Sequence, residues 1–209
     1  MDIPQILISL FVVLFAITVH EASHGYAAYK LGDPTAHALG RITLNPIAHI
    51  DPIGTILLPV ILVIMNLPPF GWAKPVPVNP LNFKNYKRDN LIVSAAGPLS
   101  NLTVAFFALI ALIPVKQYLY YSSFSMLSGL ALILYYTILI NIILAVFNLI
   151  PIPPLDGSGI IMGVLSDEAT QKYEQIRPYG FFILIILLMT GLIGRIFQVI
   201  IGIINNLIF

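Results

Sequence analysis

The stretch PQILISLFVVLFAITVHEASHGYAAY, residues 4–29, decides the class of this protein. It opens with an apolar run that is long enough for a membrane helix, which needs about 20 mostly apolar residues. It closes with His20, Glu21 and His24, polar groups that are costly inside lipid. Because ionisable groups within membrane segments usually face functional sites, the stretch predicts a spanning helix that carries such a site.

The composition of the whole chain agrees with a membrane protein. Of its 209 residues, 58% are hydrophobic and 9% are charged, whereas soluble domains carry about 25% charged residues. The net charge of +1 predicts no strong attraction to nucleic acid. There is no cysteine, so a zinc site would need histidine and carboxylate ligands.

Four apolar stretches are long enough to cross a bilayer, at about residues 4–29, 91–115, 125–150 and 179–209. Gly191, Gly194 and Arg195 interrupt the last one, which predicts a kink or a turn onto the membrane surface. We therefore predict an all-α polytopic membrane protein with one domain over residues 1–209. Its core covers about 4–165, and a C-terminal helical segment covers about 178–209.

A fifth apolar run, residues 53–67, is short for a span and is predicted to re-enter the membrane. The following segment, Phe70–Pro80, has prolines at positions 75, 77 and 80. Because these prolines exclude a helix, the segment is predicted to be a short membrane-embedded β element. A re-entrant run leaves eight Lys and Arg residues on one side and Lys116 on the other, whereas a crossing run gives six against three. Since basic loops favour the cytosol, we prefer the re-entrant topology, with the N-terminus outside.

His20, Glu21 and His24 form the pattern HExxH. Residues four apart lie on one face of a helix, so the two imidazoles can bind one metal ion and Glu21 can act as a general base for hydrolysis. At about 1.5 Å per residue the pattern lies about 24 Å from Pro4, inside a hydrocarbon core of about 30 Å. The site is therefore expected in the cytosolic half of the membrane.

A catalytic zinc ion usually has three protein ligands and one open position, so a third ligand is expected. Asp156 is the best candidate, because prolines end the third helix near Ile150 and unwound backbone at membrane depth lines wet cavities. An ordinary loop turn is the alternative interpretation. His37 and His49 lie in a polar loop and are weaker candidates.

Three motifs together resemble the site-2 protease family of intramembrane metalloproteases, in its compact prokaryotic form. They are HExxH at residues 20–24, Gly-Pro-x-x-Asn at 97–101 and Asn148 followed by Asp156-Gly157. The resemblance implies a zinc ion held by His20, His24 and Asp156, with Glu21 as the catalytic base. It also implies that Asn148 lies near the metal, where it could bind substrate or the oxyanion.

The resemblance further implies hydrolysis of peptide bonds within or near the transmembrane segments of membrane-protein substrates, in a prokaryotic cell membrane. No segment is long enough for the PDZ or CBS domains that family members often carry. Whether the protein forms a homo-oligomer is left open by the sequence. Structural support for the site is expected from Gly97, Pro98, Asn101 and Gly157.

A helical substrate must unwind before its carbonyl can be attacked, and an extended partner strand would help by β-augmentation. The segment Trp72–Val78 is the candidate strand. Its two prolines remove N–H donors from one edge, whereas Lys74, Val76 and Val78 keep theirs on the other. We expect that second edge to clamp the substrate. The alternative is that the prolines only protect an exposed edge from pairing.

Two other functions are compatible with the same residues. A metal transporter or metal-sensing membrane protein would use the His/Asp cluster with Glu21 as a ligand or proton relay. An inactive relative would only bind transmembrane partners. Glu21→Gln separates the three, because a protease loses cleavage but stays folded and metal-loaded, a transporter shows metal flux, and an inactive relative shows no change.

Overall fold

The computed structural model describes residues 3–65, 71–121 and 125–208, and within these ranges all regular secondary structure is helical. Among these described residues, three helices are long and apolar enough to cross a membrane: α1 (Ile3–Lys30), α4 (Tyr86–Tyr121) and α5 (Ser125–Asn148). The all-α prediction is confirmed. Lipid offers no partner to backbone polar groups, so apolar segments satisfy them within helices.

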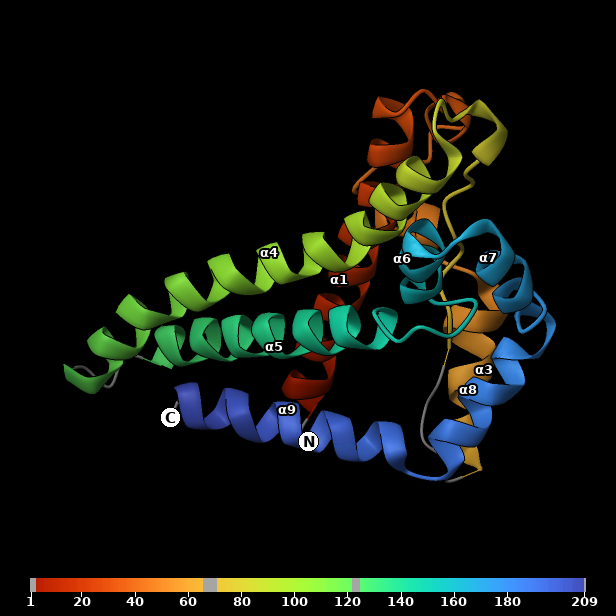
Figure 1. Cartoon of the computed structure of the whole chain (residues 1–209). Coiled ribbons are helices and arrows are strands. Elements are labelled where there is room, and N and C mark those ends of the chain that lie inside the picture. Colours follow the sequence, from red (N-terminus) through yellow and green to blue (C-terminus); the bar gives the residue numbers. More distant parts are fainter. Residues whose placement is uncertain (1–2, 66–70, 122–124, 209) are drawn as a thin grey trace.

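Helices α4 and α5 lie side by side, and α1 crosses both (Figure 1). His24 of α1 meets Val93 of α4, and His20 meets Asn101, so these two helices run in opposite directions. Asn101 in turn meets Asn141 of α5. The end of α1, the start of α4 and the end of α5 therefore lie on the same side of the molecule.

The short apolar run forms a π-helical turn at Pro52–Leu57 that continues as α3 (Leu58–Ile64). Beyond residues 66–70, which lie outside the described residues, the Trp72 N–H donates to the Gly54 carbonyl at 3.1 Å. The Thr55 hydroxyl donates to the Trp72 carbonyl at 2.9 Å. The chain has thus returned to the start of this helix. Gly54 permits the contact, because a Cβ there would collide with the indole of Trp72.

Residues 71–79 do not form the predicted β element, and the described part of the chain contains no strand. The N–H of Lys74 donates to the His49 carbonyl at 2.9 Å, and that of Val76 donates to the Glu21 carboxylate at 2.8 Å. A ladder needs one continuous partner backbone. Here the available donors meet separate elements, so the segment is irregular.

The C-terminal part begins with α6 (Asp156–Val164) and α7 (Asp167–Glu174), followed by α8 (Gly180–Met189) and α9 (Leu192–Ile208). The helical stretch Asp167–Met189, which ends with α8, and the helix α9 meet at a bend of 63°. Gly191 between them has φ +72°, a conformation that glycine adopts at little cost. The predicted kink is confirmed. Counted as one bent span, this pair makes a fourth crossing.

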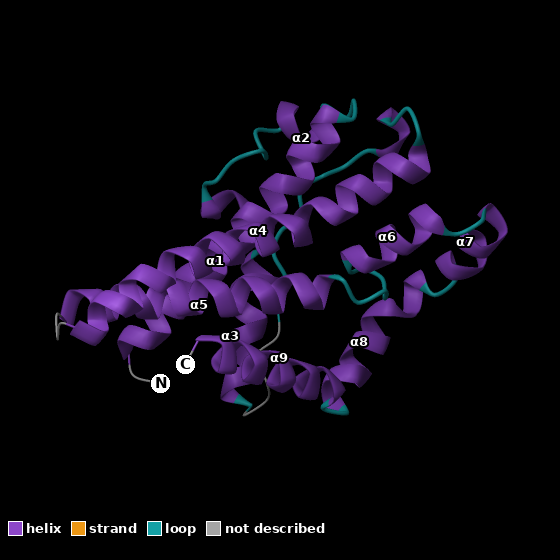
Figure 2. Ribbon diagram, turned by 60° about the vertical axis from the view of Figure 1, so that its left-hand side comes forward, coloured by secondary structure: helices purple, strands orange, loops and turns teal. Residues whose placement is uncertain are grey.

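Helix α9 turns back under α5 (Figure 2) and closes the apolar core. Phe197 of α9 contacts Phe147 of α5, and the Tyr135 hydroxyl of α5 donates to Asn205. The buried residues at this junction come from α4, α5 and α9. They are Ala108, Leu112, Ile138, Ile204 and Ile208.

Asp33 ties the end of α1 to the segment that follows residue 71. It lies in the loop before the short helix α2 (Thr35–Ala38). Elsewhere in the chain, short 3-10 turns lie at Pro46–His49, Pro80–Asn82 and Arg177–Tyr179. Asp33 accepts hydrogen bonds from Thr35, from the N–H of Asn79 at 2.7 Å and from the Asn82 amide at 2.7 Å. Burial opposes its ionisation, but these bonds outweigh that effect and hold the pKa of Asp33 below its ordinary value.

Candidate metal centre

The structure brings together three side chains from two distant parts of the chain. His20 Nε2 lies 3.0 Å from Asp156 Oδ2, and His24 Nε2 lies 3.3 Å from Asp156 Oδ1. The two Nε2 atoms are 3.1 Å apart. One ligand atom from each residue lies within 4.8 Å of the others, which is the proximity that binding one metal ion requires.

Helix spacing explains the histidine pair, because His20 and His24 are one turn apart on α1. Asp156 arrives from the other direction, as the first residue of α6. Gly157 beside it packs against the carbonyls of Leu149 and Ile150, where a Cβ would collide. The predicted unwound segment is therefore present between α5 and α6, and it delivers Asp156 to α1 through close backbone contact.

Two further glycines of α6 set its distance from α4. A Cβ on Gly159 would collide with Ser94, and one on Gly163 would meet Leu91. Glycines four residues apart share one face of a helix and allow close helix packing in membranes. The sequence analysis missed this pair, although its spacing was the signal that could have revealed it.

Gly97 lies directly against both imidazole rings, and a Cβ there would collide with His20 and His24. Its neighbour Pro98 is fully buried within α4. The prediction that the Gly-Pro-x-x-Asn motif supports the site thus has a physical basis, since α4 can approach the rings only at a residue without a side chain.

The second nitrogen of each imidazole is also held. His20 Nδ1 lies 2.6 Å from Asn101 Oδ1, and His24 Nδ1 lies 2.6 Å from the Val93 carbonyl. Both partners are carbonyl-type oxygens, which only accept. Each Nδ1 therefore carries the proton, and each Nε2 keeps a lone pair. Val93 was not predicted, because a backbone acceptor is not readable from residue type.

This donor set fits a metal ion. Two bare Nε2 atoms and a carboxylate face one another at about hydrogen-bond distance, yet none of them supplies a hydrogen in these tautomers. The buried Oδ2 of Asp156 has no hydrogen-bond partner in the part of the chain that the structure describes. Lone pairs that converge in this way repel unless a cation lies between them. Two imidazoles and one carboxylate are a ligand set typical of catalytic zinc.

The family model of peptidase family M50 matches residues 8–191. This chain belongs to that family, the site-2 proteases. It is 41% identical over 189 residues to YwhC of Bacillus subtilis (strain 168), covering 90% of this chain and 82% of the relative. It is 28% identical over 184 residues to Rip2 of Mycolicibacterium smegmatis, covering 87% of this chain and 66% of the relative. Both relatives are named as candidate zinc metalloproteases.

No solved structure matches the chain. Family membership identifies this site-2 protease as an integral membrane protein with intramembrane zinc protease function. Zinc is therefore the metal that the His/His/Asp cluster would hold. Neither relative is named as a transporter, and no finding favours that alternative.

The remaining predicted residues of the protease lie at different places around this cluster. Glu21 is half-buried, and its Oε2 accepts the hydrogen bond of Val76. Asn148 ends α5 and donates to the Leu144 carbonyl of its own helix at 3.0 Å. Among the described residues no hydrogen bond joins Asn148 to the cluster. It therefore stays a predicted substrate ligand.

The two rival ligands are outside the cluster found among the described residues. His49 is buried in the loop after α2, and its Nε2 lies 3.0 Å from the Thr43 carbonyl. His37 stacks on Tyr29 with ring centroids 4.6 Å apart. Both have contacts that are expected of structural histidines.

Proposed function

We propose that this protein cleaves the transmembrane segments of membrane-protein substrates at a centre formed by His20, His24 and Asp156, with Glu21 as the general base. One observation carries the proposal. The Nε2 atoms of His20 and His24, which have free lone pairs, converge with an unsatisfied carboxylate oxygen of Asp156. Glu21 directly follows His20 in the sequence. Family membership supplies the type of reaction.

The protein's own groups have distinct tasks in this reaction. Zinc held by the two histidines and Asp156 would polarise the scissile carbonyl and lower the pKa of bound water to about 7. Glu21 would take a proton from the attacking water and pass it to the leaving amine. The Val76 N–H holds Oε2 of this carboxylate, which leaves Oε1 to accept the proton.

Asn148 is the proposed oxyanion ligand. A side-chain amide has two N–H hydrogens, and one of them is directed at the Leu144 carbonyl. The second can donate to the oxygen that becomes negative in the transition state. Asn148 ends α5 where the loop to Asp156 begins, so one short segment would supply both the oxyanion donor and a metal ligand.

Residues Trp72–Val78 remain the proposed substrate-pairing segment. The donor edge faces the catalytic base, because the Val76 N–H bonds to Glu21. The N–H groups of Trp72 and Lys74 are bonded to the carbonyls of Gly54 and His49. Pairing would therefore require substrate carbonyls to replace acceptors that the chain now provides itself.

The proposed topology has four crossings and a re-entrant helix at residues 52–64. The return of Trp72 to Gly54 supports re-entry. The excess of Lys and Arg on the loops that adjoin the end of α1 and the start of α4 supports a cytosolic location for that side. Since the metal ligands lie toward that side, the active centre belongs to the cytosolic half.

The Glu21→Gln variant tests this function. Loss of a positioned general base costs about 10²- to 10⁴-fold in rate, while the three ligands are untouched. We expect the variant to retain one zinc ion per chain by elemental analysis and to co-purify with intact single-span membrane proteins identified by mass spectrometry. Wild-type protein should cleave those same proteins in lipid vesicles. Wild-type protein without zinc, or a variant that cleaves at the wild-type rate, would refute the proposal.

A further inference from the structure

Two asparagines are completely buried between the membrane helices. Asn101 of α4 and Asn141 of α5 each have 0% exposure. A buried amide in an apolar environment is costly unless its donors and acceptors are paired. Both amides are paired, and their partners form one connected chain of hydrogen bonds that ends at His20.

This chain of hydrogen bonds has a defined donor-to-acceptor direction. The amide nitrogen of Asn141 donates to the Thr137 carbonyl at 2.8 Å, so its oxygen faces Asn101. The amide nitrogen of Asn101 donates to that oxygen at 2.8 Å and to the Ala16 carbonyl at 3.1 Å. Both hydrogens of the Asn101 NH₂ group are therefore used, and its oxygen is the atom left to face His20.

The orientation of Asn101 decides where His20 carries its proton. Its oxygen lies 2.6 Å from Nδ1 and can only accept, so the proton lies on Nδ1. A flipped Asn101 would present N–H to the ring and favour a proton on Nε2. Nε2 is the atom 3.0 Å from Asp156, and a proton there would occupy the lone pair that a metal needs.

The partner of His24 cannot flip in this way. Its Nδ1 donates to the backbone carbonyl of Val93, whose orientation is fixed by helix α4. His20 is therefore the ligand whose tautomer depends on side chains, and those side chains come from two other spanning helices.

We infer that Asn141 is a positioning residue of the metal centre: its oxygen holds the amide of Asn101, which keeps the proton of His20 on Nδ1 and leaves Nε2 free for zinc. The inference rests on the proposed role of His20 as a ligand. Asn141 touches neither metal nor substrate. Removing its acceptor leaves one Asn101 hydrogen without a partner, while the Ala16 carbonyl still opposes a complete flip.

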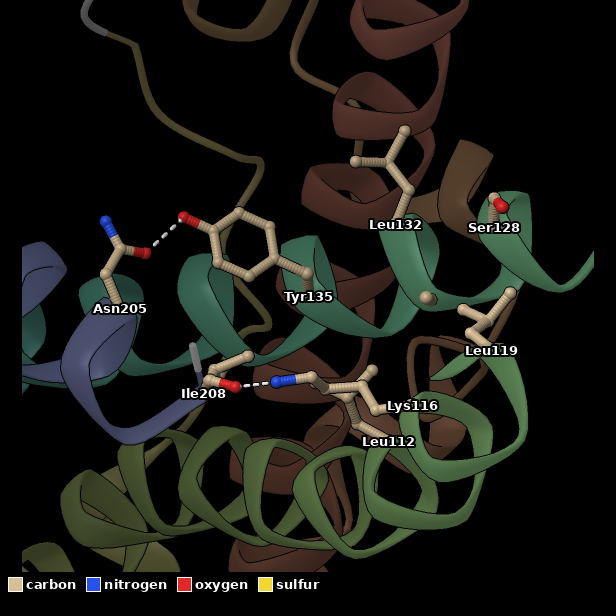
Figure 3. A pocket seen from close by; sticks show the side chains of 9 residues that line it. Leu112, Lys116, Leu119, Ser128, Leu132, Tyr135, Asn205 and Ile208 are labelled. Carbon is tan, nitrogen blue, oxygen red and sulfur yellow. Dashed lines mark hydrogen bonds between the residues drawn. The ribbon is translucent and has the colours of Figure 1, made fainter. Parts of the chain in front are cut away.

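The test compares Asn141→Leu, Asn141→Thr and Asn205→Leu. Leucine keeps bulk but removes the acceptor. The threonine hydroxyl can accept from Asn101 and donate to the carbonyl four residues earlier, as Thr137 itself does toward Ile133 at 2.8 Å. Asn205 is the matched control, since it accepts from the Tyr135 hydroxyl at 2.8 Å between α9 and α5. It lines a cavity of about 550 Å³ (Figure 3), and His20, His24 and Asp156 are not among the residues that line that cavity.

Two quantities are measured in detergent-solubilised protein. One is zinc affinity of the metal-free protein, by competition with a chelator. The other is the tautomer of His20 in the metal-free protein, from imidazole ¹⁵N chemical shifts. We expect Asn141→Leu to bind zinc about 10-fold more weakly, the lower end for loss of an outer partner, and to show increased Nε2 protonation. Asn141→Thr should recover both properties, and Asn205→Leu should match wild type.

A wild-type tautomer and affinity in Asn141→Leu would overturn the inference, as would equal losses in Asn205→Leu. If Asn141→Leu does not fold, Asn141→Ala also removes the acceptor, with a smaller side chain. Failure of the proposed function is separable, because it would appear as wild-type protein that binds no zinc or as Glu21→Gln protein that cleaves at the wild-type rate. The ¹⁵N measurement on metal-free protein still decides whether Asn141 controls the tautomer of His20.

Discussion

Gly97 lies against both imidazole rings of the metal centre, at a position where any side chain would collide with them. The centre thus requires a residue without a side chain at position 97, as well as the proposed ligands. Gly157 has a similar role next to Asp156, where it lets α6 begin against the carbonyls that follow α5. At the scale of the residue, steric room and the directions of lone pairs together define the site.

Gly97→Ala is therefore predicted to damage the centre. The new Cβ displaces one or both imidazoles, so zinc affinity should fall by about 10-fold or more, as measured by chelator competition. Gly129→Ala is the matched control, since a Cβ at Gly129 of α5 meets no atom within 4 Å. That control should keep wild-type affinity, and its helix should be stabilised by up to about 1 kcal/mol. Equal affinities in both variants would contradict the steric argument.

Among the elements, α6 and the segment at residues 71–79 are positioned by neighbours that are remote in sequence. Helix α6 carries Asp156 and is seated on α4 through Gly159 and Gly163. The segment is anchored at one end by Gly54 and at the other by Asp33. Between those anchors the Val76 N–H meets Glu21. The segment therefore has a defined place beside the proposed catalytic base without belonging to a sheet.

Val76→Pro tests the segment as an element. Proline removes the N–H that bonds to Glu21, and the flanking prolines indicate that the backbone there tolerates it. Cleavage of a protein captured by Glu21→Gln should fall by about 100-fold, while zinc content stays at one ion per chain. Val76→Ala keeps the N–H and loses only packing, so it should cleave much faster than Val76→Pro. Unchanged cleavage by Val76→Pro would show that neither the clamp nor the contact with Glu21 contributes to the rate of cleavage.

Across the whole molecule, α1, α4 and α5 bring one end of each helix to the same side. The two histidines of α1 therefore lie at the end of the molecule where Asp156 follows α5. The family match extends through residue 191 and so includes α8. We retain as proposals the single functional domain over residues 1–209 and the core at about 4–165.

The orientation of this assembly can be measured directly, because the chain contains no cysteine. Lys84→Cys places a thiol on an exposed residue before α4, and Tyr118→Cys places one on a residue with 60% exposure near the other end of α4. A membrane-impermeant maleimide should label Tyr118→Cys in intact cells and Lys84→Cys only in inverted vesicles. Wild-type protein should stay unlabelled. The reversed pattern would refute a cytosolic active centre, and labelling of both from one side would show that α4 does not cross.

Several parts of the site were predictable because they depend on local spacing. His20 and His24 share a face on any helix, and three closely spaced prolines before Asp156 remove so many N–H donors that a helix cannot continue there. The β element was predicted wrongly for a related reason. Prolines exclude a helix locally, but a strand also needs a partner backbone, and Lys74 and Val76 found separate acceptors instead.

The amino-acid sequence by itself determined that this is a helical membrane protein with a His/Glu/His pattern within its first span, since hydropathy and one-turn spacing act along the chain. Tertiary structure alone decided that Asn141 reaches Asn101, that Val93 holds His24 and that the Val76 N–H meets Glu21. These contacts join residues far apart in the chain. Their formation depends on how closely the helices pack, which glycines permit, and only the assembled helices decide which glycine faces which neighbour.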